Sequence, residues 1–357
     1  MIKIISCIYV ISIHVFMNYC VQEDGISYNV LAAESFIRCC VPLFFICSGY
    51  FMFRKQKSIR EIYGKLTRHI LLPTLFVLLI LFLFSGILQN EGNLNNLNWE
   101  AVANFLKAIV GWNVYSIENG FYLWFMVAMV KIYMAYPVLA LVCNEKREKI
   151  CNYVMILLFV GKFCFQTINY FMQNTLQVYG YSIFEEYWIF YILLGYKYSV
   201  YYKDHTFSKR ELVLGGMLYI IGSFLTYGCT VWIDVAADGV FNELFFNYDS
   251  LTVLISAIGL FLFCKNIQVK ASRGKQGITF IGKVTFKIYL VHYPVIMFLT
   301  GYGIRNMMIE SLPRSVFYLS FIGIVFILSL VLAILFSILW DWIVKGIYKA
   351  QNVIKCN

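Results

Sequence analysis

The chain has 357 residues, of which 61% are hydrophobic and only 13% are charged, and its mean hydropathy is +0.73. This composition excludes an ordinary soluble domain. The formal net charge of +10 follows from basic loops between apolar segments, so it does not indicate a nucleic-acid partner.

Ten apolar runs, each about as long as a bilayer is thick, predict an all-α polytopic membrane protein. A helix needs roughly 20 apolar residues to cross about 30 Å of hydrocarbon, and continuous rather than alternating runs indicate helices. No soluble domain interrupts the runs, so residues 1–357 are interpreted as one membrane-embedded domain. The predicted spans cover approximately residues 4–21, 36–53, 69–88, 121–143, 151–172, 182–202, 211–232, 250–266, 282–301 and 315–344.

The distribution of basic residues predicts that both termini are cytoplasmic. One set of connections carries 19 of the 29 basic residues, and the alternate set carries three. Lys and Arg gather in cytoplasmic loops, which assigns the basic set to the cytoplasm. The basic set comprises residues 1–3, 54–68, 144–150, 203–210, 267–281 and 345–357, and the other comprises 22–35, 89–120, 173–181, 233–249 and 302–314.

The first span starts with Lys3 and carries His14 at its middle. His14 lies 11 positions after Lys3, which makes three helical turns plus about 20° and places both side chains on one face, about 16 Å apart. An ionisable group inside the bilayer is costly and indicates function, and a core histidine bonded to a neighbouring helix is the alternative. We interpret Lys3 as a contact for an activated, phosphate-bearing donor from the cytoplasm, and His14 as a proton acceptor.

The second span ends in Ser48 and Gly49, small residues that permit close helix packing. The loop that follows is strongly basic, as positive-inside orientation alone would require. Its most informative feature is the spacing of Lys65 and Arg68 before Pro73. Three residues apart at a helix entrance, the two cations are expected to share one face and to suit a diphosphate.

The ninth predicted span carries two lysines one turn apart near the cytoplasm, Lys283 and Lys287. His292 lies deeper in the same span, beside Pro294, which is expected to distort the helix. We interpret the two lysines as donor contacts, and His292 as a member of the catalytic site that orients a neighbour or closes the cavity.

Ionisable side chains in other spans require partners. Lys131, Glu185 and Glu186 lie in or near spans, and Lys162 is the most centrally placed of them. Lys162 therefore needs an acidic partner or a water-filled cavity, which the sequence does not identify.

Together these stretches resemble the acyltransferase family 3 of integral membrane proteins, which O-acylate bacterial surface carbohydrates. The family's first-helix signature is Arg, ten residues, then His, and here Lys3 stands in place of the Arg before His14. Its second span ends in a Phe-Phe…Ser-Gly-Tyr pattern, matched by residues 44–50, and its following loop carries Arg-x-x-Arg, matched by Lys65 and Arg68. Leu-Trp-Phe at 123–125 and Tyr-Leu-Val-His at 289–292 look like its fourth-helix and late-helix motifs.

The resemblance covers essentially the whole chain and implies an O-acyltransferase of the bacterial cytoplasmic membrane. It implies acyl-CoA, with acetyl-CoA expected, as the donor, and a hydroxyl of a cell-surface or exported polysaccharide as the acceptor. In this interpretation His14 acts as general base or takes the acyl group transiently, and Lys3, Lys65 and Arg68 bind the CoA phosphates. No metal is expected, and polysaccharide-synthesis proteins or a second copy of the chain are candidate partners within the bilayer.

Two other classes of function stay open at this level. The chain could be a transporter or exporter of a glycan or small metabolite, or a non-catalytic membrane partner in polysaccharide synthesis. The pairing of Lys3 with His14 and the basic loop at Lys65 and Arg68 favour the enzyme, because a transporter needs no cytoplasmic cationic site the size of CoA.

The charge count generates a prediction about topology. Reporter fusions after Arg60, Lys146 and Lys209 are expected to report a cytoplasmic location, and fusions after Asn95 and Asp238 an external one. Reversal of any two of these five reporters would contradict the assigned orientation.

Overall fold

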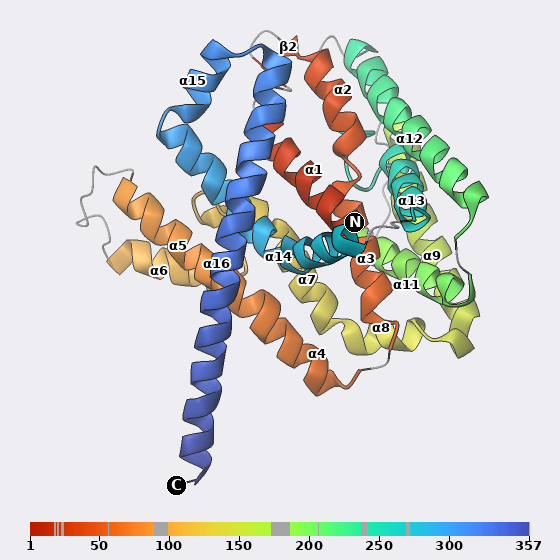
Figure 1. Cartoon of the computed structure of the whole chain (residues 1–357). Helices are drawn as coiled ribbons and strands as arrows, with labels where there is room; N and C mark the ends of the chain where they lie inside the picture. Colours follow the sequence, from red (N-terminus) through yellow and green to blue (C-terminus); the bar gives the residue numbers. More distant parts are fainter. Residues whose placement is uncertain are drawn as a thin grey trace.

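The computed structural model describes residues 1–17, 19, 21, 22, 25–55, 57–88, 99–172, 186–205, 207–236, 241–268 and 272–356. Asn95, Glu185 and Asp238, which the sequence analysis names, lie outside these residues. The described chain is almost entirely helical, as predicted, and its only strands are two-residue strands that pair antiparallel through Val21 and Ile26 (Figure 1).

The elements follow one another in a continuous series of helices, several of them interrupted by short 3₁₀ or π turns. In chain order they are α1 (Ile2–Phe16), β1 (Val21–Gln22), β2 (Gly25–Ile26), α2 (Tyr28–Ile37), α3 (Cys40–Met52), α4 (Ile59–Leu66), η1 (Thr67–Leu71), α5 (Leu72–Leu88), α6 (Trp99–Val110), η3 (Val114–Ser116), η4 (Phe121–Leu123), α7 (Trp124–Met134), α8 (Tyr136–Val142), η5 (Glu145–Arg147), α9 (Glu148–Leu158), η6 (Phe159–Cys164), α10 (Phe165–Phe171), α11 (Trp188–Asp204), α12 (Lys209–Ala236), α13 (Leu251–Lys265), α14 (Ser272–Gly301), α15 (Ile304–Ser311) and α16 (Arg314–Cys356).

The described residues contain fewer helices that are long and apolar enough to cross a membrane than the ten spans that the sequence predicts. Within the described residues, six helices are long and apolar enough to cross a bilayer. A seventh is obtained if η4–α7 and α8, which meet at a bend of 66°, count as one span. The predicted first and eighth spans correspond to α1 and α13, each of 15 residues. At 1.5 Å per residue such a helix is about 22 Å long, shorter than about 30 Å of hydrocarbon. The count of ten is therefore not confirmed, while the multi-pass all-α membrane architecture is.

Helix α1 lies inside the bundle and packs against α2, α3, α14 and α16 (Figure 1). Its buried side chains are mostly apolar, and its buried serines are satisfied within the helix. Ser6 donates to the carbonyl of Ile2 at 3.0 Å, and Ser12 to the carbonyl of Ile8 at 2.9 Å. These local bonds let a helix with polar side chains be enclosed by other helices.

Close packing of α3 against α11 confirms the expectation from Gly49. A Cβ atom built on Gly49 would lie 2.0 Å from the carbonyl oxygen of Ile192, and one built on Gly195 would lie 2.0 Å from that of Ile46. The two glycines face each other's helix reciprocally, so the backbones approach to a distance that no larger residue allows.

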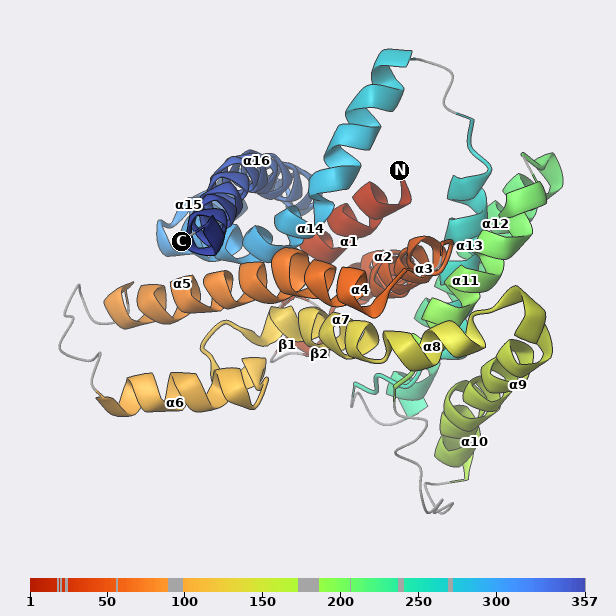
Figure 2. The same cartoon turned by 90° about the horizontal axis from the view of Figure 1, so that it is seen from below.

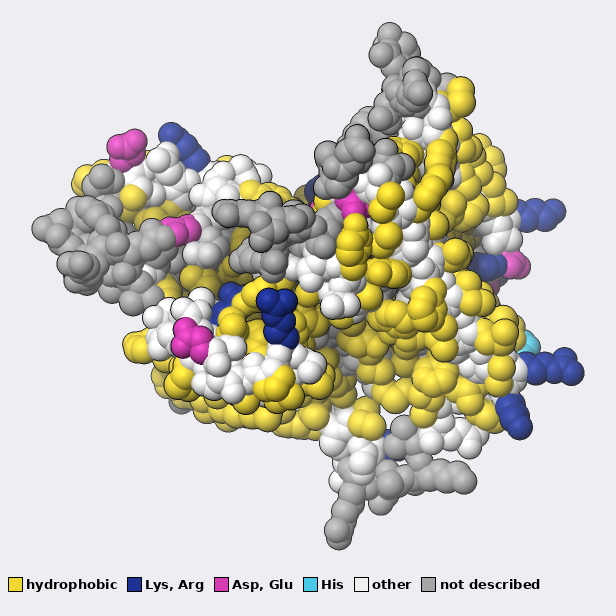
Figure 3. Space-filling view, turned by 90° about the horizontal axis from the view of Figure 1, so that it is seen from above, with side chains coloured by type: hydrophobic (Ala, Val, Ile, Leu, Met, Phe, Trp, Pro, Cys, Tyr) yellow, Lys and Arg dark blue, Asp and Glu magenta, His cyan; other side chains and the backbone are white. Residues whose placement is uncertain are grey.

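The outer surface is largely apolar. Figure 2 shows α6 running beside α5, where the rings of Phe105 and Phe82 stack at 4.4 Å, while α9 and α10 lie at the other end of the molecule. In the space-filling view the visible face is dominated by hydrophobic side chains, and most Lys and Arg side chains project from its margin (Figure 3). Such a surface is unfavourable in water and is expected of helices that face lipid.

Candidate active site

The structure brings His14 of α1 and His292 of α14 together. Their ring centroids are 5.1 Å apart, although 278 residues separate them in the chain. The rings of Phe121, Tyr122 and Tyr293 surround His14 at 6.0, 6.4 and 5.4 Å. His14 is half-buried, whereas His292 is completely buried. The sequence names both histidines but contains no indication that they form a pair.

The hydrogen bonding of His292 determines which of its nitrogens can accept a proton. Its Nδ1 lies 2.6 Å from the carbonyl oxygen of Tyr289. A carbonyl only accepts, so Nδ1 must carry the hydrogen, and in the neutral ring Nε2 then presents a lone pair. Within the described chain this buried Nε2 has no partner, and neither has Nδ1 of His14. Two adjacent histidines with unpartnered buried nitrogens are unusual for a purely structural pair and indicate a site for a substrate group.

Pro294 explains how the aromatic wall beside the histidines is attached to α14. Because proline has no N–H, the carbonyl four residues earlier, that of Leu290, loses its helical partner. The hydroxyl of Tyr122 donates to this carbonyl at 2.8 Å. In return the hydroxyl of Tyr289 donates to the carbonyl of Tyr122. This reciprocal pair, which we call the tyrosine clasp (Tyr122 and Tyr289), holds η4 against α14.

The turn that precedes Tyr122 is built for this close approach. Asn119 has a φ of 56°, the left-handed region that asparagine tolerates well. The next residue, Gly120, has no room for a side chain, because a Cβ atom would lie 2.5 Å from the carbonyl oxygen of Val114. The local sequence therefore directs Phe121 and Tyr122 toward α14.

Four of the five predicted donor-binding cations converge on one pocket. The pocket has a volume of about 390 Å³ and is lined by Lys3, Arg68, Lys283 and Lys287. None of the described residues that line it is acidic. A concentration of positive charge in a pocket whose described lining contains no acidic side chain is suited to a phosphate-bearing ligand.

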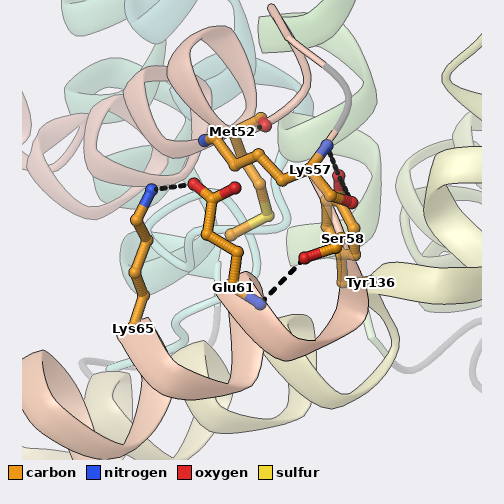
Figure 4. A network of polar contacts seen from close by, with 6 residues as sticks. All are labelled: Met52, Lys57, Ser58, Glu61, Lys65 and Tyr136. Atoms are coloured by element: carbon orange, nitrogen blue, oxygen red, sulfur yellow. Dashed lines mark hydrogen bonds and ion pairs between the residues drawn. The ribbon is translucent and has the colours of Figure 1, made fainter.

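Lys65, the fifth predicted cation, does not line this pocket. Its Nζ lies 2.7 Å from a carboxylate oxygen of Glu61, one turn earlier in α4, as Figure 4 shows. Ser58 caps the same helix by accepting from the backbone N–H of Glu61 at 3.2 Å. After Lys65 the chain enters the π turn η1, whose i→i+5 bonds widen the helix. The widened turn removes the expected alignment of Lys65 with Arg68, and only Arg68 reaches the pocket.

The sequence analysis did not identify Trp340 or His69 as pocket residues, although both line it. Trp340 donates from its indole Nε1 to the carbonyl of Arg68 at 3.1 Å, and so α16 closes the pocket over η1. Nothing in the sequence joins these residues, because 272 positions separate Trp340 from Arg68. His69 directly follows Arg68 in the motif region. This adjacency is the one feature of the sequence that could have identified His69 as a pocket residue.

Tyr289 separates the pocket from the two histidines. Its side chain lines the cation-lined pocket, and its ring centroid is 5.5 Å from that of His292. A ligand whose phosphates lie on the cations would therefore place its far end one side chain away from the histidine pair.

The remaining cations in spans lie elsewhere and have partners. Lys162, on the π turn η6, pairs with Asp249 at 3.0 Å, and both side chains are nearly buried. Lys131 pairs with Glu186 at 2.6 Å. Arg38, which the sequence analysis did not single out as a site residue, donates from Nε to the carbonyl of Phe246 at 2.9 Å and stacks on that ring. These cations are neutralised or shielded by their partners, and none of them lines the cation-lined pocket.

The tyrosine clasp generates a prediction about stability. Tyr122→Phe is expected to destabilise the fold by about 1–3 kcal/mol, because the buried Leu290 carbonyl loses its hydroxyl partner. Thermal unfolding in detergent should show a lower midpoint. Tyr293→Phe is the matched control, since this tyrosine belongs to the same aromatic cluster but its hydroxyl forms no hydrogen bond in the described structure. Equal losses in the two variants would mean that ring packing, not the clasp, holds η4.

Comparison with known proteins identifies the family. The family described as an acyltransferase domain, Acyl_transf_3, matches residues 1–338. No curated protein and no solved structure matches the chain. The family match includes every residue of the histidine pair, all four cations of the pocket and both members of the tyrosine clasp. The chain belongs to this acyltransferase family of multi-pass membrane proteins.

Proposed function

We propose that the protein transfers an acyl group, with acetyl the expected group, from cytoplasmic acyl-CoA to a hydroxyl of a cell-surface or exported polysaccharide. The observation that supports this most directly is the position of Tyr289, which lies between a pocket of four cations and the pair His14–His292. Acyl-CoA carries its phosphates at one end and its thioester at the other. The cation-lined pocket and the histidine pair are arranged in the same order. The bacterial cytoplasmic membrane is the location that suits such a donor and acceptor.

In this proposal the CoA phosphates bind to Lys3, Arg68, Lys283 and Lys287. Arg68 contributes a planar fork of donors, and the lysines contribute mobile point charges. No described residue that lines the pocket is acidic, which supports an anionic ligand at this place. Lys65, which is paired with Glu61, would contribute to the field at longer range only.

The acyl transfer itself requires removal of one proton. His14 takes the proton of the acceptor hydroxyl, whose oxygen attacks the thioester carbonyl carbon. The C–O bond of the ester forms, the C–S bond breaks, and CoA leaves as the thiol after taking a proton. His14 suits the role of base because its ring is half-buried and thus within reach of a substrate. His292 is fully buried and is held by the Tyr289 carbonyl, which suits a group that positions the reacting atoms or its neighbour.

The donor site can be tested by binding. Arg68→Glu is expected to weaken the binding of acetyl-CoA to the purified protein by at least about tenfold, because a charge-assisted contact becomes a repulsion. Lys65→Glu introduces the same charge three residues away but outside the pocket, and it should have a clearly smaller effect. Isothermal titration calorimetry in detergent measures both constants. Unchanged affinity in folded Arg68→Glu protein would remove this pocket from the donor site.

The catalytic role of His14 can be tested by acyl transfer to glycan. His14→Ala is expected to leave expression and membrane insertion intact, because it removes a polar group from an apolar region. The rate of acetyl transfer should fall by about 10²–10⁴, the usual contribution of a general base. His292→Ala should reduce the rate less. Acetyl esters on surface glycan are measured by NMR in cells that carry each variant.

Two results of this test would contradict the proposal. Near wild-type acetylation by folded His14→Ala protein would exclude a catalytic His14. A His14→Ala protein that fails to fold stably would instead favour a structural histidine. Tyr293→Phe, which leaves both histidines in place, serves as the control for changes in this aromatic cluster.

A further inference from the structure

A second cavity lies on the outer side of α14, between α5 and α16. It has a volume of about 800 Å³, and its described lining is wholly apolar. The lining residues are Phe76, Val77, Ile80, Leu81 and Phe84 of α5, Val291, Pro294, Val295, Met297 and Phe298 of α14, and Leu328, Val331, Leu332, Leu335, Phe336 and Leu339 of α16. Many of these side chains are exposed, including Leu335 at 57%. The cavity is therefore a groove open to the surroundings, with α14 as its floor, and we call it the α5–α16 groove.

One end of the α5–α16 groove meets the cation-lined pocket. The rings of Phe76 and Phe336, one from each wall, stack at 5.6 Å with an interplanar angle of 13°. Nζ of Lys287 lies 5.8 Å from the centroid of the Phe336 ring. Trp340, one turn beyond Phe336, lines the cation-lined pocket itself. The described lining of the groove is apolar along its length, and Lys287 places a positive charge at this end.

The length of the groove corresponds to one leaflet. Along α16 the lining extends from Leu328 to Leu339, and 11 residues at 1.5 Å each make about 16 Å. Half of a hydrocarbon core of about 30 Å is about 15 Å. The distribution of Lys and Arg among the loops assigns the Lys287 end of the groove to the cytoplasmic side. Anionic lipids of the cytoplasmic leaflet are attracted to basic residues in this position.

We propose that the α5–α16 groove binds an anionic phospholipid of the cytoplasmic leaflet, with a hydrocarbon chain along the groove and the phosphate near Lys287. The hydrocarbon chain fills the space between α5 and α16, which are joined at this end by the ring contacts of Phe76 with Phe336 and Trp340. The phosphate of the lipid then lies near Lys287, at the depth in the membrane where lipid head groups begin. The hydrocarbon part of this site is independent of acyl transfer, whereas its head-group end shares Lys287 with the proposed donor pocket.

Retention of lipid by the full-length protein tests the apolar part of the site. The wild-type protein is incubated in detergent with dioleoyl phosphatidylglycerol or dioleoyl phosphatidylcholine, and bound lipid is counted by native mass spectrometry. Leu335→Trp fills the groove and should abolish most of the retained lipid. Leu319→Trp makes the same change at an exposed position of α16 outside the groove and should retain it. Leu332→Phe is a second, smaller filling variant in case Leu335→Trp is poorly folded. Equal retention by all these proteins would overturn the proposal.

Substitution of two lysines tests the role of the positive charge at the end of the groove. Lys287→Gln should reduce the preference for phosphatidylglycerol over phosphatidylcholine about fivefold, the usual effect of one basic residue near an anionic head group. Lys283→Gln should not, because Lys287 rather than Lys283 is the lysine whose Nζ lies 5.8 Å from the ring of Phe336 in the groove wall. Equal retention of the two lipids by the wild type would show that the groove takes bulk lipid only.

Two further measurements separate this site from its alternatives. Displacement of retained lipid by palmitoyl-CoA but not by acetyl-CoA would assign the groove to a donor chain and overturn the proposal. A dimer in the wild type that Leu335→Trp dissociates would assign it to a second copy of the chain. Lipid retention should be normal in His14→Ala protein, so a failure of the proposed catalysis would leave this result unaffected.

Discussion

The arrangement of the site depends on one missing hydrogen bond in α14. Helices in hydrocarbon must satisfy their backbone polar groups internally, and a proline inside a helix leaves one carbonyl without a partner. Pro294 does this to the carbonyl of Leu290, and the hydroxyl of Tyr122 provides the replacement. The same interaction brings η4 against α14 and places the aromatic rings around His14. A local defect in one helix thereby becomes the point at which three separate segments of the chain are held together.

Helix packing supplies the second condition for the site. Van der Waals contact, rather than hydrophobic transfer, drives association between helices in a membrane, so small residues determine how closely they approach. Gly49 and Gly195 allow the backbones of α3 and α11 to touch. This contact fixes α3, whose residues Phe44 and Ser48 line the cation-lined pocket. Packing at the glycines thus contributes directly to the wall of the pocket.

The cations of the described chain divide into two groups with different roles. Lys162 and Lys131 have acidic partners within reach, and their charges serve the fold. Lys3, Arg68, Lys283 and Lys287 surround a volume without acidic residues among its described lining. Their convergence on one pocket is the feature that supports the proposed binding of a phosphate-bearing ligand there.

The sequence by itself determined the class of the protein and its family, and it named most of the residues of the candidate site. Hydropathy predicts membrane helices because burial in hydrocarbon demands apolar side chains, and the Lys3–His14 spacing, Arg68 and His292 can be recognised one motif at a time. Its predicted count of ten spans exceeds the six or seven sufficiently long helices found among the described residues, because apolar composition does not measure helix length.

Tertiary structure alone decided the contacts between distant positions: His14 with His292, Tyr122 with Leu290, Trp340 with Arg68, and Lys162 with Asp249. It also decided that Lys65 turns to Glu61, since a π turn and a nearby carboxylate change its direction without changing its spacing from Arg68. Such pairings depend on which faces of separate helices meet, and no periodicity within one helix contains that information.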